Sequence, residues 1–296
     1  MAVSQEEIER GARLIYTCLE SALAEKKGCF IGRNGTIESM VLGEDGFSKE
    51  LARTLELHAG VFPSTEESVV QWKKEYQIAL ASLQTEPIVA GWYKPTKAIE
   101  QQFLQKYAPH CPHIPLRSLE PYYVAPELRW TNLLRGKKVA IVSSFANTCV
   151  KQVPNAQEIW GNQADSLLPP ATYIPIPTGY SPVLAQGRAG WPVYCNTWQK
   201  AIGCVIDKVN AEKPDIVLIG CGGLGMVLAG ILKGNGFPCV VLGGAIQVLF
   251  GIKGGRWEHH SVIGAFWNDA WVWPSDEETP RSSWKIEGGC YWNPHQ

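Results

Sequence analysis

Short apolar runs alternate with amphipathic segments along most of the chain. The strongest runs cover residues 28–33, 136–144, 171–177, 215–220 and 237–244. Nearly continuous apolar runs of this length, each ending in a glycine or polar turn, are typical of buried parallel strands. The segments between them are long enough for helices that return the chain across a sheet. The pattern therefore predicts an α/β fold with a mostly parallel sheet and helices on both faces.

Helix signals fill most of the intervals between these strands. Ser64 to Glu67 form a capping box that opens a helix ending near Leu83. The other predicted elements are a strand at 86–93, helices at 5–26, 48–60, 96–107, 156–161 and 245–252, a helix capped by Asn196 that ends near Asn210, and a long loop at 178–194. No repeat or linker is visible, so we predict one domain over residues 1–296. It begins with a helix and ends in an irregular, Trp-rich tail.

The amino-acid composition of the chain argues against some classes of function. The net charge of −1 provides no broad basic surface for nucleic acid or an anionic membrane. No apolar run reaches the ~18 residues expected of a membrane span, and the charged N-terminal helix does not resemble a signal peptide. Nine scattered cysteines cannot all pair, which indicates a reducing compartment. We therefore expect a cytoplasmic protein without a nucleic-acid partner or a membrane span.

A glycine loop follows the apolar run DIVLIG. Gly220, Gly222 and Gly225 fit the pattern G-x-G-x-x-G, which lets the backbone turn tightly and approach a ligand. The first N–H groups of the next helix attract phosphate, so we expect ligand contacts from Gly222, Gly223, Leu224 and Gly225. The acidic residue that holds a dinucleotide ribose is missing about 20 residues later. A phosphate or nucleotide-sugar site, an NAD or FAD site and a structural turn all stay open.

Polar turns follow two further strands. Because the carboxyl ends of parallel strands share one edge, we expect these turns and the glycine loop to converge there on a ligand. An Arg after a buried strand suits phosphate or carboxylate, and hydroxyl and amide groups suit a sugar or phosphate. The predicted contacts are Arg33, Asn34, Gly35, Ser143, Ser144 and Asn147. Helix capping or a simple helix start is the alternative role of both turns.

A basic turn covers residues 253–260. Lys253 and Arg256 suit a diphosphate, and Trp257 suits stacking on a base or a sugar. His259 is a general-base candidate. A solvated basic loop is the alternative interpretation.

Four motifs occur in one order along the chain: IGRNGTIE, VAIVSSFANT, IVLIGCGGLGMVLAGILKGNG and EGGCYW. Together they resemble the GT-D-type glycosyltransferases, a bacterial and viral family with a Rossmann-like sheet. The resemblance covers roughly residues 28–292. It implies a transferase that moves a sugar from a nucleotide-diphosphate sugar, typically a UDP-sugar, to a glycan acceptor.

The first motif of that family, R-x-G-D-G-E, is only partly present. Arg33, Gly35 and Glu38 match it, whereas Thr36 replaces Asp and Ile37 replaces Gly. The resemblance implies Mn²⁺ or Mg²⁺ at the acidic pair. One carboxylate of that pair is missing here, so the metal would depend on Glu38 and the diphosphate.

Two residues are candidates for catalysis at such a site. Glu38 and His259 are the predicted catalytic residues, with Glu38 also the predicted metal ligand. Lys253 and Arg256 are an alternative to the metal, because they would neutralise a leaving diphosphate directly. An NAD(P)-dependent oxidoreductase and a non-catalytic nucleotide- or sugar-binding module are the alternative functions.

Overall fold

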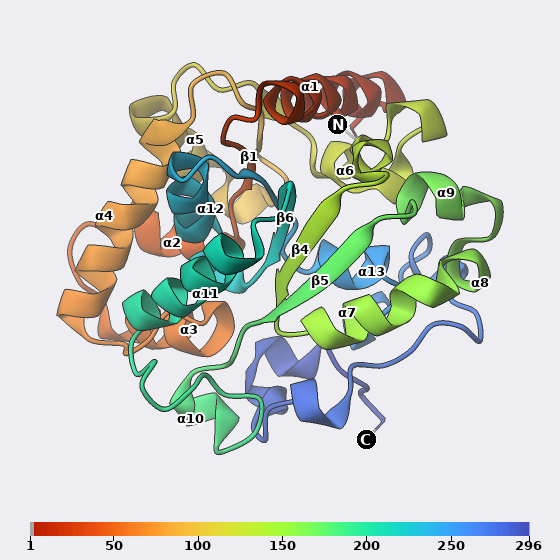
Figure 1. Ribbon diagram of the computed structural model, residues 1–296. Coiled ribbons are helices and arrows are strands. Elements are labelled where there is room, and N and C mark those ends of the chain that lie inside the picture. Colours follow the sequence, from red (N-terminus) through yellow and green to blue (C-terminus); the bar gives the residue numbers. More distant parts are fainter. Residues whose placement is uncertain (1–2, 296) are drawn as a thin grey trace.

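The computed structural model describes residues 3–295, so Met1, Ala2 and Gln296 of the predicted domain lie outside the described residues. Seven strands form one sheet in the order β3-β2-β1-β7-β6-β4-β5, and all neighbouring pairs are parallel (Figure 1). The strands are β1 (Cys29–Arg33), β2 (Ile88–Val89), β3 (His113–Ile114), β4 (Lys138–Ser143), β5 (Thr172–Pro177), β6 (Ile216–Gly220) and β7 (Pro238–Val241). The predicted α/β fold with a parallel sheet is confirmed.

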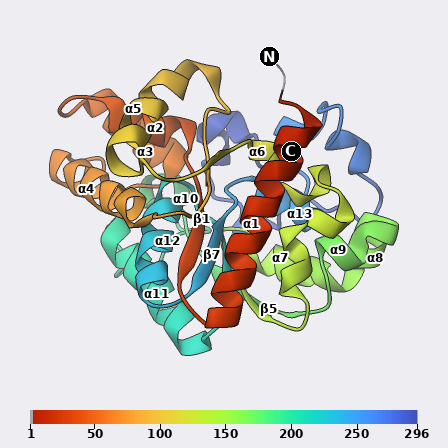
Figure 2. The same ribbon diagram turned by 90° about the horizontal axis from the view of Figure 1, so that it is seen from above.

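Helices cover both faces of this sheet. One apolar cluster joins it to α3, α4, α11 and α12, and another joins it to α1, α7 and α13. Figure 2 shows α1 on the opposite side of β1 and β7 from α11 and α12. The helices are α1 (Gln5–Glu25), α2 (Thr36–Gly43), α3 (Lys49–Ala59), α4 (Glu66–Ser82), α5 (Lys97–Tyr107), α6 (Leu116–Leu119), α7 (Ala146–Gln152), α8 (Ala156–Trp160), α9 (Ala164–Leu167), α10 (Pro182–Ala185), α11 (Trp198–Glu212), α12 (Gly225–Gly234) and α13 (Ala245–Leu249). Among residues 3–295, none of these helices has both the length and the apolar character needed to cross a membrane.

The continuous apolar runs explain why both faces are covered. Successive side chains of a strand point to opposite faces. In β4, Val139 and Ile141 join one apolar cluster, whereas Ala140 and Val142 join the other. All four side chains are fully buried. One uninterrupted run therefore supplies both cores, and the strand requires helices on each side.

Several boundaries differ from the predicted ones because short elements carry weak sequence patterns. β2 and β3 have two residues each, so most of the predicted strand at 86–93 is loop. α2 begins at Thr36, inside the polar turn predicted after β1, and α7 and α10 lie in predicted loops. Thr197, not Asn196, caps α11, because its side chain accepts a hydrogen bond from the N–H of Lys200.

A buried polar network holds the chain directly after β1. The side chain of Asn34 donates to Glu100 at 2.9 Å and accepts from the Tyr76 hydroxyl at 2.8 Å. Glu100 also accepts from the N–H of Gly91, and the Asn34 carbonyl accepts from the Trp92 indole. Asn34 is 1% exposed and is thus engaged inside the protein. Its position does not support the ligand contact that we predicted for it.

Replacing Tyr76 by Phe removes a donor from this network and leaves Oδ1 of Asn34 buried without a partner. An unsatisfied buried polar group costs about 1–3 kcal/mol. We expect Tyr76→Phe to lower the free energy of unfolding by this amount in chemical denaturation. Lys74→Ala, at an exposed position of the same helix, should change it by less than about 0.5 kcal/mol. Equal unfolding free energies for the two variants would contradict the role of the network.

Candidate functional site

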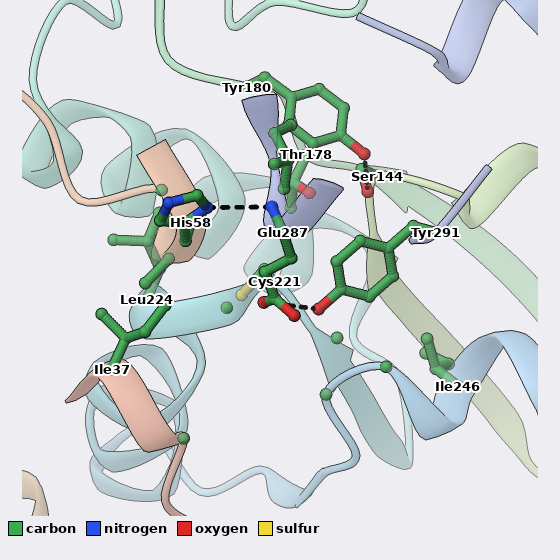
Figure 3. Close-up of a pocket in the computed structure, with 18 of the residues that line it drawn as sticks. Ile37, His58, Ser144, Thr178, Tyr180, Cys221, Leu224, Ile246, Glu287 and Tyr291 are labelled. Atoms are coloured by element: carbon green, nitrogen blue, oxygen red, sulfur yellow. Dashed lines mark hydrogen bonds between the residues drawn. The ribbon is translucent and has the colours of Figure 1, made fainter. Parts of the chain in front are cut away.

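A cavity of about 170 Å³ lies at the carboxyl edge of the sheet. The segments that follow β1, β2, β4, β5, β6 and β7 line it, together with the end of α3 and the C-terminal segment around Glu287 (Figure 3). Arg33, Glu38 and part of the glycine loop share this cavity although they lie far apart in the chain. The expected convergence of these loops at one edge is therefore observed.

Arg33 is a half-buried cation that forms no ion pair with a described residue. Its guanidinium lies over the Trp92 ring, with Cζ 5.0 Å from the centroid. It also lies against the backbone of Gly243, where φ is +57° and an added Cβ would overlap Nη1. Nε is buried without a hydrogen-bond partner, and Arg33 forms no ion pair with any residue that the structure describes. A desolvated charge is costly unless it is paired, so this position fits an anionic ligand.

Glu38 is a buried acidic residue in the same cavity as Arg33. It lies in the first turn of α2 and is 7% exposed. Gly35 leaves the carboxylate room to fold back over the helix start, since an added Cβ at Gly35 would overlap Oε2 of Glu38. Burial raises the pKa of Glu38, its own N–H and Arg33 oppose that rise, and Glu287 adds to it. A carboxylate with a raised pKa in a cavity is a candidate base.

Glu287 is a second carboxylate of the cavity, and the sequence analysis did not assign it a role. Its Oε2 accepts from Arg256 Nη2 at 2.5 Å, and its Oε1 accepts from the Tyr291 hydroxyl at 3.2 Å (Figure 3). Its backbone N–H donates to Nδ1 of His58 at 3.0 Å. Glu287 has a φ of +47°, a left-handed conformation that costs a non-glycine residue about 1–3 kcal/mol. Its place in the EGGCYW motif was the available signal.

His58 is a further cavity residue that the sequence analysis missed. It lies near the end of α3, and its Nδ1 accepts the hydrogen bond from Glu287. A neutral imidazole that accepts at Nδ1 carries its proton on Nε2. A neutral His58 therefore has one hydrogen-bond donor, Nε2, that Glu287 does not use. No sequence motif marks it, because it becomes part of the site only through the packing of α3.

The glycine loop has a structural as well as a ligand-facing part. Gly222 has a φ of +57°, and an added Cβ would lie 2.7 Å from the carbonyl oxygen of Ala59. Only glycine therefore allows the loop to pack this closely on the end of α3. Gly222 and Leu224 line the cavity, whereas Gly223 and Gly225 do not. The Gly223 carbonyl instead accepts a hydrogen bond from a buried indole, and Gly225 opens α12.

The turn after β4 places one of its three predicted contacts in the cavity. Ser144 lines it and accepts a hydrogen bond from the Tyr180 hydroxyl at 2.8 Å (Figure 3). Ser143 is fully buried, and its hydroxyl accepts from the N–H of Phe145. Asn147 is exposed at the start of α7, outside the cavity. Ser143 therefore bonds within the turn and does not cap α7, whose N-cap is Phe145 and has no side-chain capping hydrogen bond.

The fold places only part of the basic turn at the site. Arg256 lines the cavity, and the ring of Trp257 packs 5.7 Å below its guanidinium. Lys253 instead places its ammonium over the Trp267 ring, and His259 is exposed to solvent. Neither of these two side chains lines the cavity or the groove beside it. His259 is therefore not placed for the catalytic role that we predicted, and Lys253 is not placed to bind a diphosphate.

A larger groove of about 910 Å³ adjoins the cavity. The two spaces share Arg33, Trp92, Gly244 and Arg256. The remaining walls of the groove come from the N-terminal part of α1, from the segments after β2 and β3, and from Ala245, Trp257, His260 and Ile263. Glu120 lies in this wall, where burial raises its pKa to about 7 and Arg33 opposes the rise. A ligand in the cavity therefore has direct access to a second and wider space.

The donor groups of the cavity do not fit the divalent metal that the sequence resemblance implies. Thr36 stands where that resemblance has Asp, and the carboxylate of Glu287 is already bonded to Arg256. Among residues 3–295, no three His, Cys, Asp or Glu side chains gather as a metal site. Mg²⁺ and Mn²⁺ prefer several oxygen ligands, and Glu38 alone supplies too few. Arg33 and Arg256 are the positive charges that the chain itself provides here.

Comparison with known proteins gives structural matches alone. No family model matches the chain, and no curated protein matches it at a significant level. A selenomethionine-substituted structure of domain of unknown function 1792 is 14% identical, covers 82% of this chain and 83% of its own, and superposes with a TM-score of 0.41. A second structure, described as showing that this domain has a distinct glycosyltransferase fold, is 14% identical, covers 98% and 95%, and has a TM-score of 0.45. Likeness this distant says nothing about the activity of this chain.

Glu120 yields a prediction about pH and stability. Its pKa of about 7 in the folded protein lies above the 4.5 of an unperturbed Glu. Between these values the folded state keeps a proton that the unfolded state has lost, so this group's stabilisation disappears as the pH rises. We expect the unfolding free energy of the wild type to fall, relative to Glu120→Gln, between about pH 5 and about pH 8. A difference that does not change over this range would contradict the raised pKa.

Proposed function

We propose that this protein is a glycosyltransferase that moves a sugar from a nucleotide-diphosphate sugar, most simply a UDP-sugar, to a hydroxyl of a glycan acceptor. The observation that carries the proposal is the presence of two guanidinium groups and two carboxylates in one cavity at the carboxyl edge of the sheet. Such edges are where open α/β sheets bind ligands.

The leaving group of this reaction is a diphosphate, which must be stabilised as its charge develops. Arg33 forms no ion pair with a described residue, and Arg256, whose Nη2 donates to Glu287, lines the same cavity. Guanidinium groups bind phosphate oxygens through paired N–H donors. Cations fixed in place before the reaction stabilise a developing negative charge without reorganisation. Arg33 and Arg256 are therefore the groups that we assign to the diphosphate.

The acceptor hydroxyl must lose a proton as it attacks. In this step the acceptor oxygen bonds to the anomeric carbon, the bond from that carbon to the diphosphate oxygen breaks, and the hydroxyl proton passes to a base. We assign the base to Glu38, because burial raises its pKa and no side-chain hydrogen bond contributes to its pKa. A base is most effective when its pKa approaches the working pH.

Glu287 has a different environment and hence a different role. Arg256 donates to one of its oxygens and Tyr291 to the other, so the carboxylate is held in one orientation. A fixed negative charge stabilises the positive charge that develops on a sugar ring during transfer. Two carboxylates whose environments differ in this way are typical of acid–base and electrostatic roles divided between neighbours.

The alternative of a dinucleotide-dependent oxidoreductase lacks its ribose ligand. The strand beside the glycine loop is β7, and the chain continues from it through Leu242 and Gly243 without Asp or Glu. A carboxylate at that point would hold the ribose. Turnover distinguishes the other alternative, because a binding module without catalytic activity would release no nucleoside diphosphate from a nucleotide sugar.

Glu38→Gln tests the assignment of the base. With purified protein and a panel of nucleotide sugars, release of free nucleoside diphosphate should fall by about 10²–10⁴-fold, the usual contribution of a general base. The variant should fold, because an uncharged amide replaces a buried acid. Wild-type turnover in Glu38→Gln would remove Glu38 from the mechanism.

The controls separate loss of the base from other effects. Glu50→Gln, at an exposed position of α3, should turn over like the wild type. Gly35→Ala keeps the Glu38 carboxylate but displaces it, so it should lose activity as Glu38→Gln does. Chelation with EDTA should leave turnover unchanged if the arginines replace a metal. No release from any nucleotide sugar by the wild type would favour the binding module.

A further inference from the structure

The groove beside the cavity carries four cations that the transfer chemistry does not use, in addition to Arg33 and Arg256. Six Lys or Arg side chains line it against two Glu side chains, although the whole chain has a net charge of −1. Arg10, Lys94, Lys97 and Arg117 are exposed, and none of them forms an ion pair with a residue that the structure describes. Unpaired cations in a concave site attract anionic ligands.

The sizes of the two spaces fit two parts of one ligand. The cavity of about 170 Å³ is close to the ~150 Å³ that encloses a benzene ring, and so has room for about one sugar ring. A nucleoside diphosphate needs more space, which the groove of about 910 Å³ provides. The groove also presents aromatic rings at Trp92 and Tyr123, and aromatic rings suit the stacking of a base.

Arg33 and Arg256 lie where the two spaces meet. Arg33 brings a buried Nε without a partner to this junction. A diphosphate at the junction would place the sugar on the side of Glu38 and Glu287 and the nucleoside on the side of the groove cations. This is the order of the parts in a nucleotide-diphosphate sugar.

We propose that the groove is the binding site for the nucleoside diphosphate of the donor, with Lys94, Lys97 and Arg117 contacting its phosphates and ribose. The inference rests on the proposed glycosyltransferase function. It adds that donor affinity depends on residues outside the sequence motifs, on the segments after β2 and β3. The acceptor then enters the cavity from the side of Tyr180 and Trp191.

Calorimetric titration with UDP, UMP and uridine tests this assignment on the full chain. Lys94→Gln/Lys97→Gln should weaken UDP binding by about tenfold or more per lost contact, as expected for hydrogen bonds to charged groups. UMP should lose less affinity than UDP, and uridine should lose least, because it has a ribose but no phosphate. Both lysines are exposed, so the melting temperature should be unchanged. Lys253→Gln, outside both spaces, is the matched control and should bind UDP like the wild type.

The outcomes separate this inference from the function on which it rests. Weaker UDP binding by the double variant, with an unchanged control, supports the groove as the donor site. Wild-type affinity in the double variant overturns the groove assignment but leaves the transferase proposal standing. If the wild type binds no nucleoside diphosphate at all, the transferase proposal itself fails.

Discussion

The placement of the Arg33 guanidinium is the constraint on which the rest of the site depends. It lies at the carboxyl end of β1, against Gly243 and Trp92, with one nitrogen buried and unpaired. Leaving a cation in this state is unfavourable for folding alone. The fold keeps the guanidinium in this position, because the network around Asn34 and the left-handed conformation of Gly243 fix the backbone around it. A buried polar atom without a partner in the protein is typical of a site prepared for a ligand.

The two carboxylates show how one cavity produces two chemistries. Glu38 has lost solvent and gained no side-chain hydrogen bond, so its pKa rises. Glu287 keeps an arginine and a tyrosine on its oxygens, and an αL backbone holds it in place. The first is suited to exchange a proton, and the second is held in one orientation by its two partners.

The sequence predicted the parts of this arrangement that local patterns encode. Long apolar runs such as that of β4 identified the parallel sheet, and the parallel sheet placed Arg33, Glu38 and Gly222 at one edge. The residues that were missed or misplaced depend on packing between distant segments. His58 and Glu287 are 229 positions apart in the sequence, yet a hydrogen bond joins them. Lys253 and Arg256 belong to one turn and are three positions apart. Lys253 packs on the Trp267 ring, however, whereas Arg256 lines the cavity.

A crystal structure of the protein soaked with a UDP-sugar would test the central claim most directly. The account predicts density for the sugar between Glu38 and Glu287, for the diphosphate between Arg33 and Arg256, and for the nucleoside in the adjoining groove. Density at another surface, or a sugar bound away from both carboxylates at a saturating concentration of the ligand, would contradict it.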